Sequence, residues 1–190
     1  DELACLQKAI DATGAMYARA REIVRPGINE LEVFSELQAA ATRSLGEPPT
    51  AAGNDFACGV PGGPPRDREA QDGELYILDL GPGYRGYNAD NCRAIAVNGR
   101  PTEVQQAAWE QIAAVFPIVE RNVKPGFRCR ELYEEVKAHL DRHLPGSFTH
   151  HLGHGIGLFP HEAPHLNPSW DDTFELGEVF TVEPGLYSEE

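Results

Sequence analysis

Two aspartates, Asp79 and Asp90, lie in a stretch from Tyr76 to Val97 that reads as two apolar strands joined by a Gly/Pro-rich turn. If the strands pair antiparallel with Asp79 opposite Asp90, the turn is centred on Tyr84-Arg85. The two carboxylates then share a face, roughly 5 Å apart at Cβ. Like charges that close repel unless a cation lies between them, and two divalent metal ions about 3.5–4 Å apart would supply that charge. The alternative is a pair of solvated positions on a half-exposed hairpin.

The second half of the chain carries further candidate metal ligands. Five histidines lie between His150 and His165, and three of them stand among three glycines in Phe148–Leu158. Glycines allow close backbone approach and positive φ, which suits a histidine presented from a tight loop. Farther on, Glu178–Gly185 reads as a strand end in which Val179, Thr181 and Glu183 share a face. Carboxylates with one imidazole suit Mn, Fe, Co or Zn better than a soft metal.

The elements that must position these residues are mostly helical. Apolar residues at three- and four-residue spacing predict a helix over Leu3–Val24, which Pro26-Gly27 ends. Asn29–Glu32 resembles a capping box that opens a second helix running to about Leu45. A loop rich in proline and glycine follows, with a short strand near Phe56.

After an Asn98-Gly99 turn, the residues Thr102–Gln105 should cap a third helix, in which Pro117 predicts a kink or a break. An internal repeat also emerges, because Val24–Leu37 matches Val123–Val136 at a constant offset of 99 residues. In each copy a helix ends at Pro-Gly and an amphipathic helix follows. The simplest fold consistent with this repeat has two helix–helix–strand halves that cover one sheet. A site at the junction of the halves would draw ligands from both.

Composition limits the classes of function. A length of 190 residues is ample for one domain with a core, and the net charge of −14 argues against nucleic acid or anionic membrane as a partner. No apolar run reaches the length of a membrane span. Four scattered cysteines suit reduced thiols in a cytoplasmic protein. Because the chain starts at Asp1 and stops abruptly at Glu190, we expect a fragment of something longer.

The ordered residues now resemble a known family. The series Asp79, Asp90, Gly-His154-Gly-Ile-Gly, His161-Glu-x-Pro and Glu183-Pro-Gly is similar to that of the pita-bread metallopeptidases. These include methionine aminopeptidases, aminopeptidase P, prolidase and the creatinase relatives. The resemblance implies an α+β pita-bread fold, a pseudo-twofold repeat of a helix pair plus antiparallel strands around a curved sheet. It also implies that residues 1–190 form the catalytic domain, truncated at its C-terminal end and lacking any upstream N-terminal domain.

The same resemblance implies roles for individual residues. The metal ligands would be Asp79, Asp90, His154 and Glu183, which would hold two divalent ions, Mn before Co, Zn or Fe. Glu183 and His161 would be the catalytic residues. The context of His150 resembles the proline-directed branch, so His150 and His161 would contact a peptide substrate. The implied reaction removes the N-terminal residue from Xaa-Pro peptides with metal-activated water, in a monomer or a homodimer.

Two departures from the family pattern stand out. The family's fifth ligand, a glutamate on a later strand, has no counterpart before Glu190. A substrate-binding histidine expected ahead of Asp79 is replaced by glycine or proline in Val60–Asp67. Two alternatives therefore stay open: an enzyme like methionine aminopeptidase, and a pita-bread domain that binds without catalysing.

Overall fold

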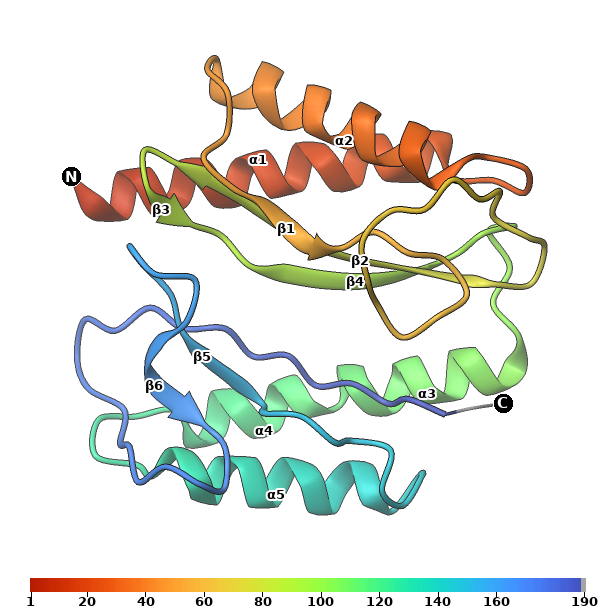
Figure 1. The fold of residues 1–190 in the computed structure, drawn as a ribbon. Coiled ribbons are helices and arrows are strands. Elements are labelled where there is room, and N and C mark those ends of the chain that lie inside the picture. The colour runs from red at the N-terminus through yellow and green to blue at the C-terminus, as the bar shows by residue number, and fades with distance from the viewer. Residues whose placement is uncertain (189–190) are drawn as a thin grey trace. The chain divides into compact units, whose positions relative to one another are not determined.

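The computed structural model describes residues 1–188, which divide into two compact units (Figure 1). The first unit comprises residues 1–101 and 157–160, and the second comprises residues 102–156 and the chain from 161 onward. Each unit combines helices with antiparallel strands, so the mixed α and β content expected from the sequence is confirmed.

In the first unit, two helices cover one face of an antiparallel sheet (Figure 1). The Asn29 side chain caps the second helix by accepting a hydrogen bond from the backbone N–H of Leu31. Both predicted helices are confirmed to within a residue or two. The elements are α1 (Glu2–Ile23), α2 (Glu30–Leu45), β1 (Ala52–Asp55), β2 (Leu75–Tyr84), β3 (Tyr87–Asn88) and β4 (Asn91–Ala96).

Strand β2 is the centre of this sheet, since it pairs with β1, β3 and β4. Its side chains alternate in burial, and Tyr76, Leu78 and Leu80 pack into the core beneath the helices. Because successive side chains point to opposite faces, Asp79 belongs to the face away from α1 and α2.

The predicted position of the hairpin turn is wrong. Tyr84 pairs with Tyr87, so the turn is centred on Arg85-Gly86 instead of Tyr84-Arg85. Both turn residues have positive φ, 53° and 88°, as the two-residue hairpin turn with matching twist requires. The preceding Gly81–Gly83 segment, expected in the turn, continues β2.

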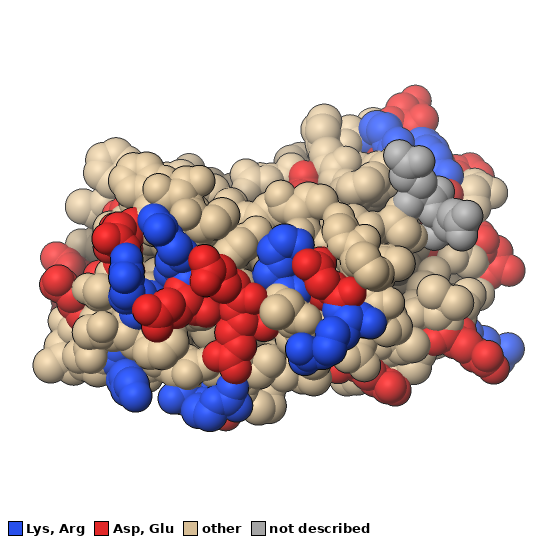
Figure 2. All heavy atoms as spheres, turned by 90° about the horizontal axis from the view of Figure 1, so that it is seen from below, with Lys and Arg blue, Asp and Glu red and all other residues tan. Residues whose placement is uncertain are grey.

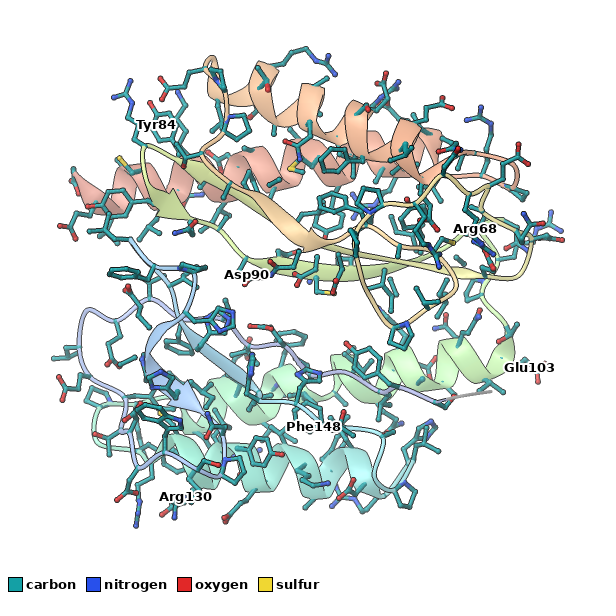
Figure 3. The ribbon with its side chains drawn as sticks, viewed as in Figure 1. Arg68, Tyr84, Asp90, Glu103, Arg130 and Phe148 are labelled. Atoms are coloured by element: carbon teal, nitrogen blue, oxygen red, sulfur yellow. The ribbon has the colours of Figure 1, made fainter. Side chains whose placement is uncertain are left out.

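This register changes the relation between the two aspartates. Asp79 pairs with Cys92, and Asp90 precedes β4 as the residue two positions away from that partner. The aspartates are thus diagonal neighbours across the strand pair. Diagonal residues lie about 7–8 Å apart, whereas directly opposed residues lie about 5 Å apart at Cβ. A shift by two residues leaves the face unchanged, and Figure 3 shows Asp90 on the side of the sheet opposite α1 and α2.

The second unit packs three helices with a small two-stranded sheet (Figure 1). Thr102 and Gln105 form the predicted capping box. The predicted break is also confirmed, because Pro117 lacks the N–H that would bond to the Ala113 carbonyl and the helix ends there. The elements are α3 (Glu103–Ala113), α4 (Val115–Asn122), α5 (Cys129–Asp141), β5 (Gly153–Gly155) and β6 (Glu162–Leu166).

The predicted strand around Glu183 is an extended segment that runs beside β5. Backbone N–H groups of Thr181 and Glu183 donate to the carbonyls of His154 and Leu152, at 2.8 and 2.7 Å. Phe180 on this segment packs against the core of the second unit, to which Phe148 also belongs (Figure 3). His154 therefore lies on a strand with neighbours on both sides.

The internal repeat extends to individual hydrogen bonds. Gly27 and Gly126, which end the first helix of each copy, both have a φ of 83°. Their N–H groups donate to the carbonyls of Ala70 and Phe174, each at 2.8 Å. The second helix of each copy begins at the matching position, residue 30 in one and residue 129 in the other. Each Pro-Gly junction is thus held by a strand-like contact with a later loop.

The surface charges, the helices and the cysteines of the structure are consistent with what the composition indicates. On the face that Figure 2 presents, acidic side chains are interspersed with the basic ones. Among residues 1–188, none of the helices combines the length and the apolar character needed to cross a bilayer. All four cysteines are free thiols.

Candidate metal centre

Three carboxylates gather on the sheet of the first unit. Asp79 on β2 and Asp90 ahead of β4 are both half-buried. Asp55 on β1 pairs directly with Asp79, a neighbour that the sequence reading did not single out. The Asp55 carboxylate accepts a hydrogen bond from the N–H of Gly63 at 2.6 Å, so it also anchors the following loop.

The loop from Val60 to Asp67, where the family pattern expects a histidine, is fixed by a buried ion pair. Arg66 lies with its Nη2 2.6 Å from the Oε1 of Glu30, whose side chain is fully buried at the start of α2. Glu30 also accepts from the backbone N–H groups of Cys58 and Arg66. Burial opposes ionisation of Glu30, but these hydrogen bonds outweigh it and lower its pKa.

In the second unit, close backbone packing explains the glycines around His154. A Cβ on Gly153 would lie 2.1 Å from the Thr181 carbonyl oxygen, and one on Gly155 would lie 1.9 Å from that of Ala163. Neither glycine has positive φ. The expectation of close approach is confirmed, whereas the expectation of a tight loop with positive φ is wrong, because His154 lies on a central extended strand.

His154 is held in one orientation. Its side chain is only 3% exposed, and its Nδ1 lies 3.0 Å from the carbonyl oxygen of Gly155. A carbonyl can only accept, so Nδ1 carries a proton. The Nε2 atom lies 3.2 Å from Oε1 of Glu183. With a proton on Nε2 the two groups form a hydrogen-bonded ion pair, and with a metal cation in place of that proton both atoms would be ligands.

Glu183 is strongly biased toward its charged form. Burial would raise the pKa of this carboxyl, but hydrogen bonds from His151, His154 and Thr181 outweigh burial and hold it well below its usual value. Thr181 also accepts from the backbone N–H of His154 at 3.1 Å, which ties the extended segment to β5. The result is an anionic group fixed beside a buried imidazole.

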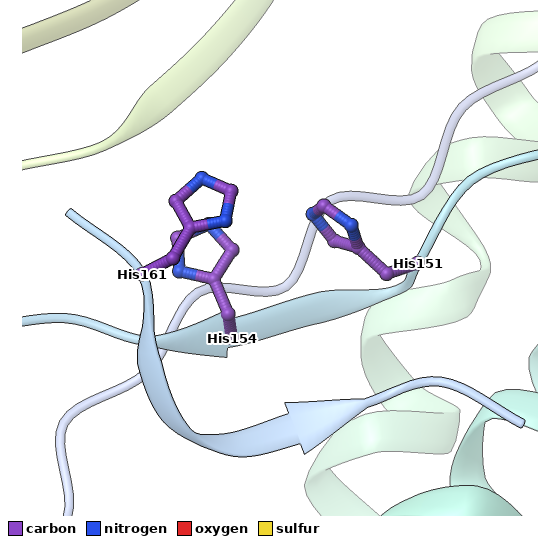
Figure 4. Close-up of side chains that lie close together, drawn as sticks. All are labelled: His151, His154 and His161. Atoms are coloured by element: carbon purple, nitrogen blue, oxygen red, sulfur yellow. The ribbon is translucent and has the colours of Figure 1, made fainter. Parts of the chain in front are cut away.

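Two further histidines complete a cluster (Figure 4). His161, just ahead of β6, stacks on His154 with ring centroids 3.7 Å apart and planes 15° apart. His151, just ahead of β5, has its ring centroid 5.4 Å from that of His154 and 5.6 Å from that of His161. One ring nitrogen from each of the three lies within 4.8 Å of the others. His161 and His154 were predicted for this site, and His151 was missed.

His150 lies beside the cluster, with its ring centroid 5.8 Å from that of His151. Its Nδ1 donates to the carbonyl of His151 at 2.7 Å, and its ring packs edge-on against Phe148 and Tyr187. Burial lowers the pKa of His150, which favours a neutral ring. Within residues 1–188, its Nε2 is buried without a hydrogen-bond partner.

The donor chemistry of these residues fits a divalent cation. Zinc and the other borderline first-row metals bind imidazole nitrogens and carboxylate oxygens. A site for these metals can therefore form without a cysteine thiolate. Glu183 and His154 already face each other with a geometry that a cation would stabilise.

Comparison with known proteins agrees with this chemistry. Residues 4–190 match metallopeptidase family M24, and the chain belongs to that family. Its fold is the pita-bread fold of the prolidases, since it superimposes on prolidase from Pyrococcus furiosus with a TM-score of 0.89 at 29% identity. That match covers 98% of this chain and 56% of the prolidase chain.

Two curated relatives are named for Xaa-Pro peptides. An Xaa-Pro dipeptidase from Pyrococcus horikoshii is 30% identical over 190 residues, covering 98% of this chain and 54% of the relative. An Xaa-Pro aminopeptidase from Escherichia coli is 29% identical, covering 98% of this chain and 47% of the relative. The chain thus spans about half the length of the curated relatives it matches.

Proposed function

We propose that this chain supplies the catalytic domain of a metal-dependent exopeptidase that removes the N-terminal residue from Xaa-Pro peptides. The observation that carries the proposal is the fixed pair of His154 and Glu183, whose facing nitrogen and oxygen are both atoms that can ligate a divalent metal. Membership of a metallopeptidase family, with relatives named for Xaa-Pro cleavage, supports the same reading. Those names also favour it over a methionine aminopeptidase.

The proposed metal ligands are Asp79, Asp90, His154 and Glu183, holding two ions, with manganese preferred over cobalt, zinc or iron. Bound divalent ions would supply Lewis-acid activation of water and of the scissile carbonyl. Around them, Glu183 would hold or pass a proton, and His161 would orient the carbonyl being attacked. His161 is exposed and stacks on buried His154, so a substrate can reach it while its ring is supported.

The remaining expectations belong to the same proposal. His150, held by Phe148 and the His151 carbonyl, would line the substrate site. Four free thiols fit a reducing, cytoplasmic setting. Size-exclusion chromatography with light scattering would decide between monomer and homodimer.

The test uses the full-length protein with Xaa-Pro dipeptides, longer Xaa-Pro peptides and Met-Ala peptides, assayed with added Mn²⁺ or Co²⁺. We expect Xaa-Pro cleavage that a chelator abolishes and Mn²⁺ restores. Glu183→Gln and Asp90→Asn should each lower kcat/KM more than about a hundredfold, because changes one step removed from a metal ligand already cost 10–100-fold.

Asp171→Asn is the matched control, because Asp171 forms only an exposed ion pair with Arg128 and should retain activity. Hydrolysis confined to Met-Ala peptides would replace the Xaa-Pro assignment. A folded, metal-loaded protein that cleaves none of these peptides would contradict catalysis and favour the binding module.

A further inference from the structure

A buried tyrosine on α1 reaches the backbone beside both aspartates of the first unit. We propose that Tyr17 is a positioning residue, whose hydroxyl fixes the spacing between the backbone segments that carry Asp79 and Asp90. The inference rests on the proposed function, because a role for that spacing requires the two aspartates to act together. Tyr17 would act through the backbone alone and would touch neither a metal ion nor the substrate.

The Tyr17 hydroxyl lies between two carbonyl oxygens on different strands. It is 2.8 Å from the carbonyl oxygen of Leu78 and 2.6 Å from that of Asn91. Leu78 precedes Asp79 on β2, and Asn91 follows Asp90 at the start of β4. A hydroxyl has one proton and a carbonyl can only accept, so the two carbonyls share that proton in a three-centre hydrogen bond. The bond therefore joins the strands one residue away from each aspartate.

The ladder between β2 and its partners is interrupted at Asp90. Pairing ends at Asn88 on β3 and resumes at Asn91 on β4, and Ala89 and Asp90 belong to neither strand. The residue of β2 opposite Ala89 in this register is Pro82, which has no N–H to donate. The N–H of Ala89 donates to the Pro82 carbonyl at 3.3 Å. Asp90 thus lies in an interruption of the ladder, next to the carbonyl that Tyr17 contacts.

Packing holds Tyr17 itself in place. Its side chain is 6% exposed and belongs to the core that α1 and α2 form with the sheet. Leu78 and Leu80, which flank Asp79 on β2, are buried in the same core. A side chain already ordered by packing loses little further rotamer freedom when it forms a hydrogen bond. Tyr17 therefore ties the backbone beside both aspartates to the most rigid part of the first unit.

Tyr76 provides a matched control within the same core. Its hydroxyl donates to the Phe56 carbonyl at 2.9 Å, and its side chain is fully buried. Tyr76 thus resembles Tyr17 in chemistry and burial, but its bond joins β2 to the opposite neighbour of the sheet, away from Asp90. A general loss of core stability should appear in both Tyr→Phe variants. An effect on the aspartates is expected for Tyr17→Phe alone.

The first experiment compares Tyr17→Phe and Tyr76→Phe in the full-length protein, with Mn²⁺ as the probe. Electron paramagnetic resonance of free Mn²⁺ during a titration gives the affinity without reference to catalysis. We expect Tyr17→Phe to weaken Mn²⁺ binding by about tenfold, the lower end of the range for changes beyond the direct ligands. Tyr76→Phe should leave the affinity unchanged. An unchanged Mn²⁺ affinity in Tyr17→Phe would overturn the inference.

Amide hydrogen exchange in the metal-free protein tests the positioning directly. We expect Tyr17→Phe to speed exchange at residues 89–91, and Tyr76→Phe to leave it unchanged. The wild-type rates decide the matter if Tyr17→Phe does not fold, because exchange at residues 89–91 as fast as at the exposed turn residues Arg85 and Gly86 would overturn the inference. A protein that shows both Tyr17 effects but cleaves no Xaa-Pro peptide would contradict the proposed function alone.

Discussion

His154 shows how a single residue is positioned by what surrounds it. Glycines on both sides allow two neighbouring backbones to approach so closely that any side chain there would overlap a carbonyl oxygen. The imidazole is then locked by one contact on each ring nitrogen. The glycines therefore matter for packing, and only indirectly for chemistry.

This packing predicts a large cost for Gly155→Ala. The added Cβ would lie 1.9 Å from the Ala163 carbonyl oxygen, so β5 and β6 must separate. We expect the free energy of unfolding of the second unit to fall by about 2–4 kcal/mol. Denaturant unfolding monitored by circular dichroism measures this loss.

Gly14→Ala is the control, because Gly14 is exposed in α1 and an added Cβ there meets nothing within 4 Å. Because alanine has a higher helix propensity than glycine, Gly14→Ala should leave the free energy of unfolding unchanged or raise it by about 0.5–1 kcal/mol. Equal effects of the two substitutions would show that the close approach at β5 does not constrain the protein.

The adjacent histidines His150 and His151 explain why part of the site was missed. His150 packs on Phe148, while His151 joins the cluster with His154. The two neighbouring rings also touch each other, with centroids 5.8 Å apart. The family pattern includes a histidine at position 150, so the second imidazole was passed over. The density of five histidines between positions 150 and 165 was the signal that could have found it.

At the scale of elements, the repeated helix–turn–helix is the most regular feature of the chain. Each copy turns at a Pro-Gly whose glycine has a φ of 83° and whose N–H donates at 2.8 Å to a later loop. A Cβ on either Gly27 or Gly126 meets nothing within 4 Å. The two glycines are therefore required for their backbone conformation alone.

We expect Gly27→Ala and Gly126→Ala to destabilise their own units by similar amounts, about 1–2 kcal/mol each, the cost of left-handed backbone for an ordinary residue. Separate unfolding measurements with a probe in each unit check this. A difference of more than about 1 kcal/mol between the two would show that the copies have diverged energetically.

Most elements were predictable because their signals are local. Helix periodicity, the Thr102 cap and the break near Pro117 act within a few residues of the positions they determine. The hairpin turn was misplaced because Asp79 was assumed to lie directly opposite Asp90, whereas Asp79 pairs with Cys92 and the turn with positive φ lies at Arg85-Gly86. Pairing of Asp55 with Asp79 depends on a connection through a long loop, which no local pattern reveals.

At the scale of the whole molecule, the dominant feature is an excess of acidic residues, with a net charge of −14. Stability toward acid then depends on carboxylates that the fold keeps ionised. The hydrogen bond from Arg68 is the largest of the influences that together lower the pKa of Glu74 from 4.5 to about 2. Figure 3 labels Arg68 at the loop end of the sheet in the first unit.

Because the folded pKa of Glu74 is below its unfolded value, this stabilisation is present above about pH 4.5 and is lost as the pH falls toward 2. Glu74→Gln should lower the unfolding free energy at pH 7 by about 1–2 kcal/mol, after allowance for solvent screening of the partly exposed Arg68. The difference from wild type should shrink toward pH 3. Urea unfolding between pH 7 and 3 measures it.

Glu69→Gln serves as the control, since Glu69 is exposed in the same loop. It should not reproduce the pH-dependent difference. If the two variants lose stability in parallel from pH 7 to 3, the ion pair with Arg68 does not shape the acid response.

The hairpin between β2 and β4 limits how this protein can change in length. Because its two acidic positions keep a common face only when the register moves by an even number of residues, a one-residue slip of β4 against β2 would send Asp90 to the helix side of the sheet. A one-residue insertion at Arg85-Gly86 therefore has to be taken up by a longer turn. Engineered loop grafts at this tip should keep the pairing of Tyr84 with Tyr87.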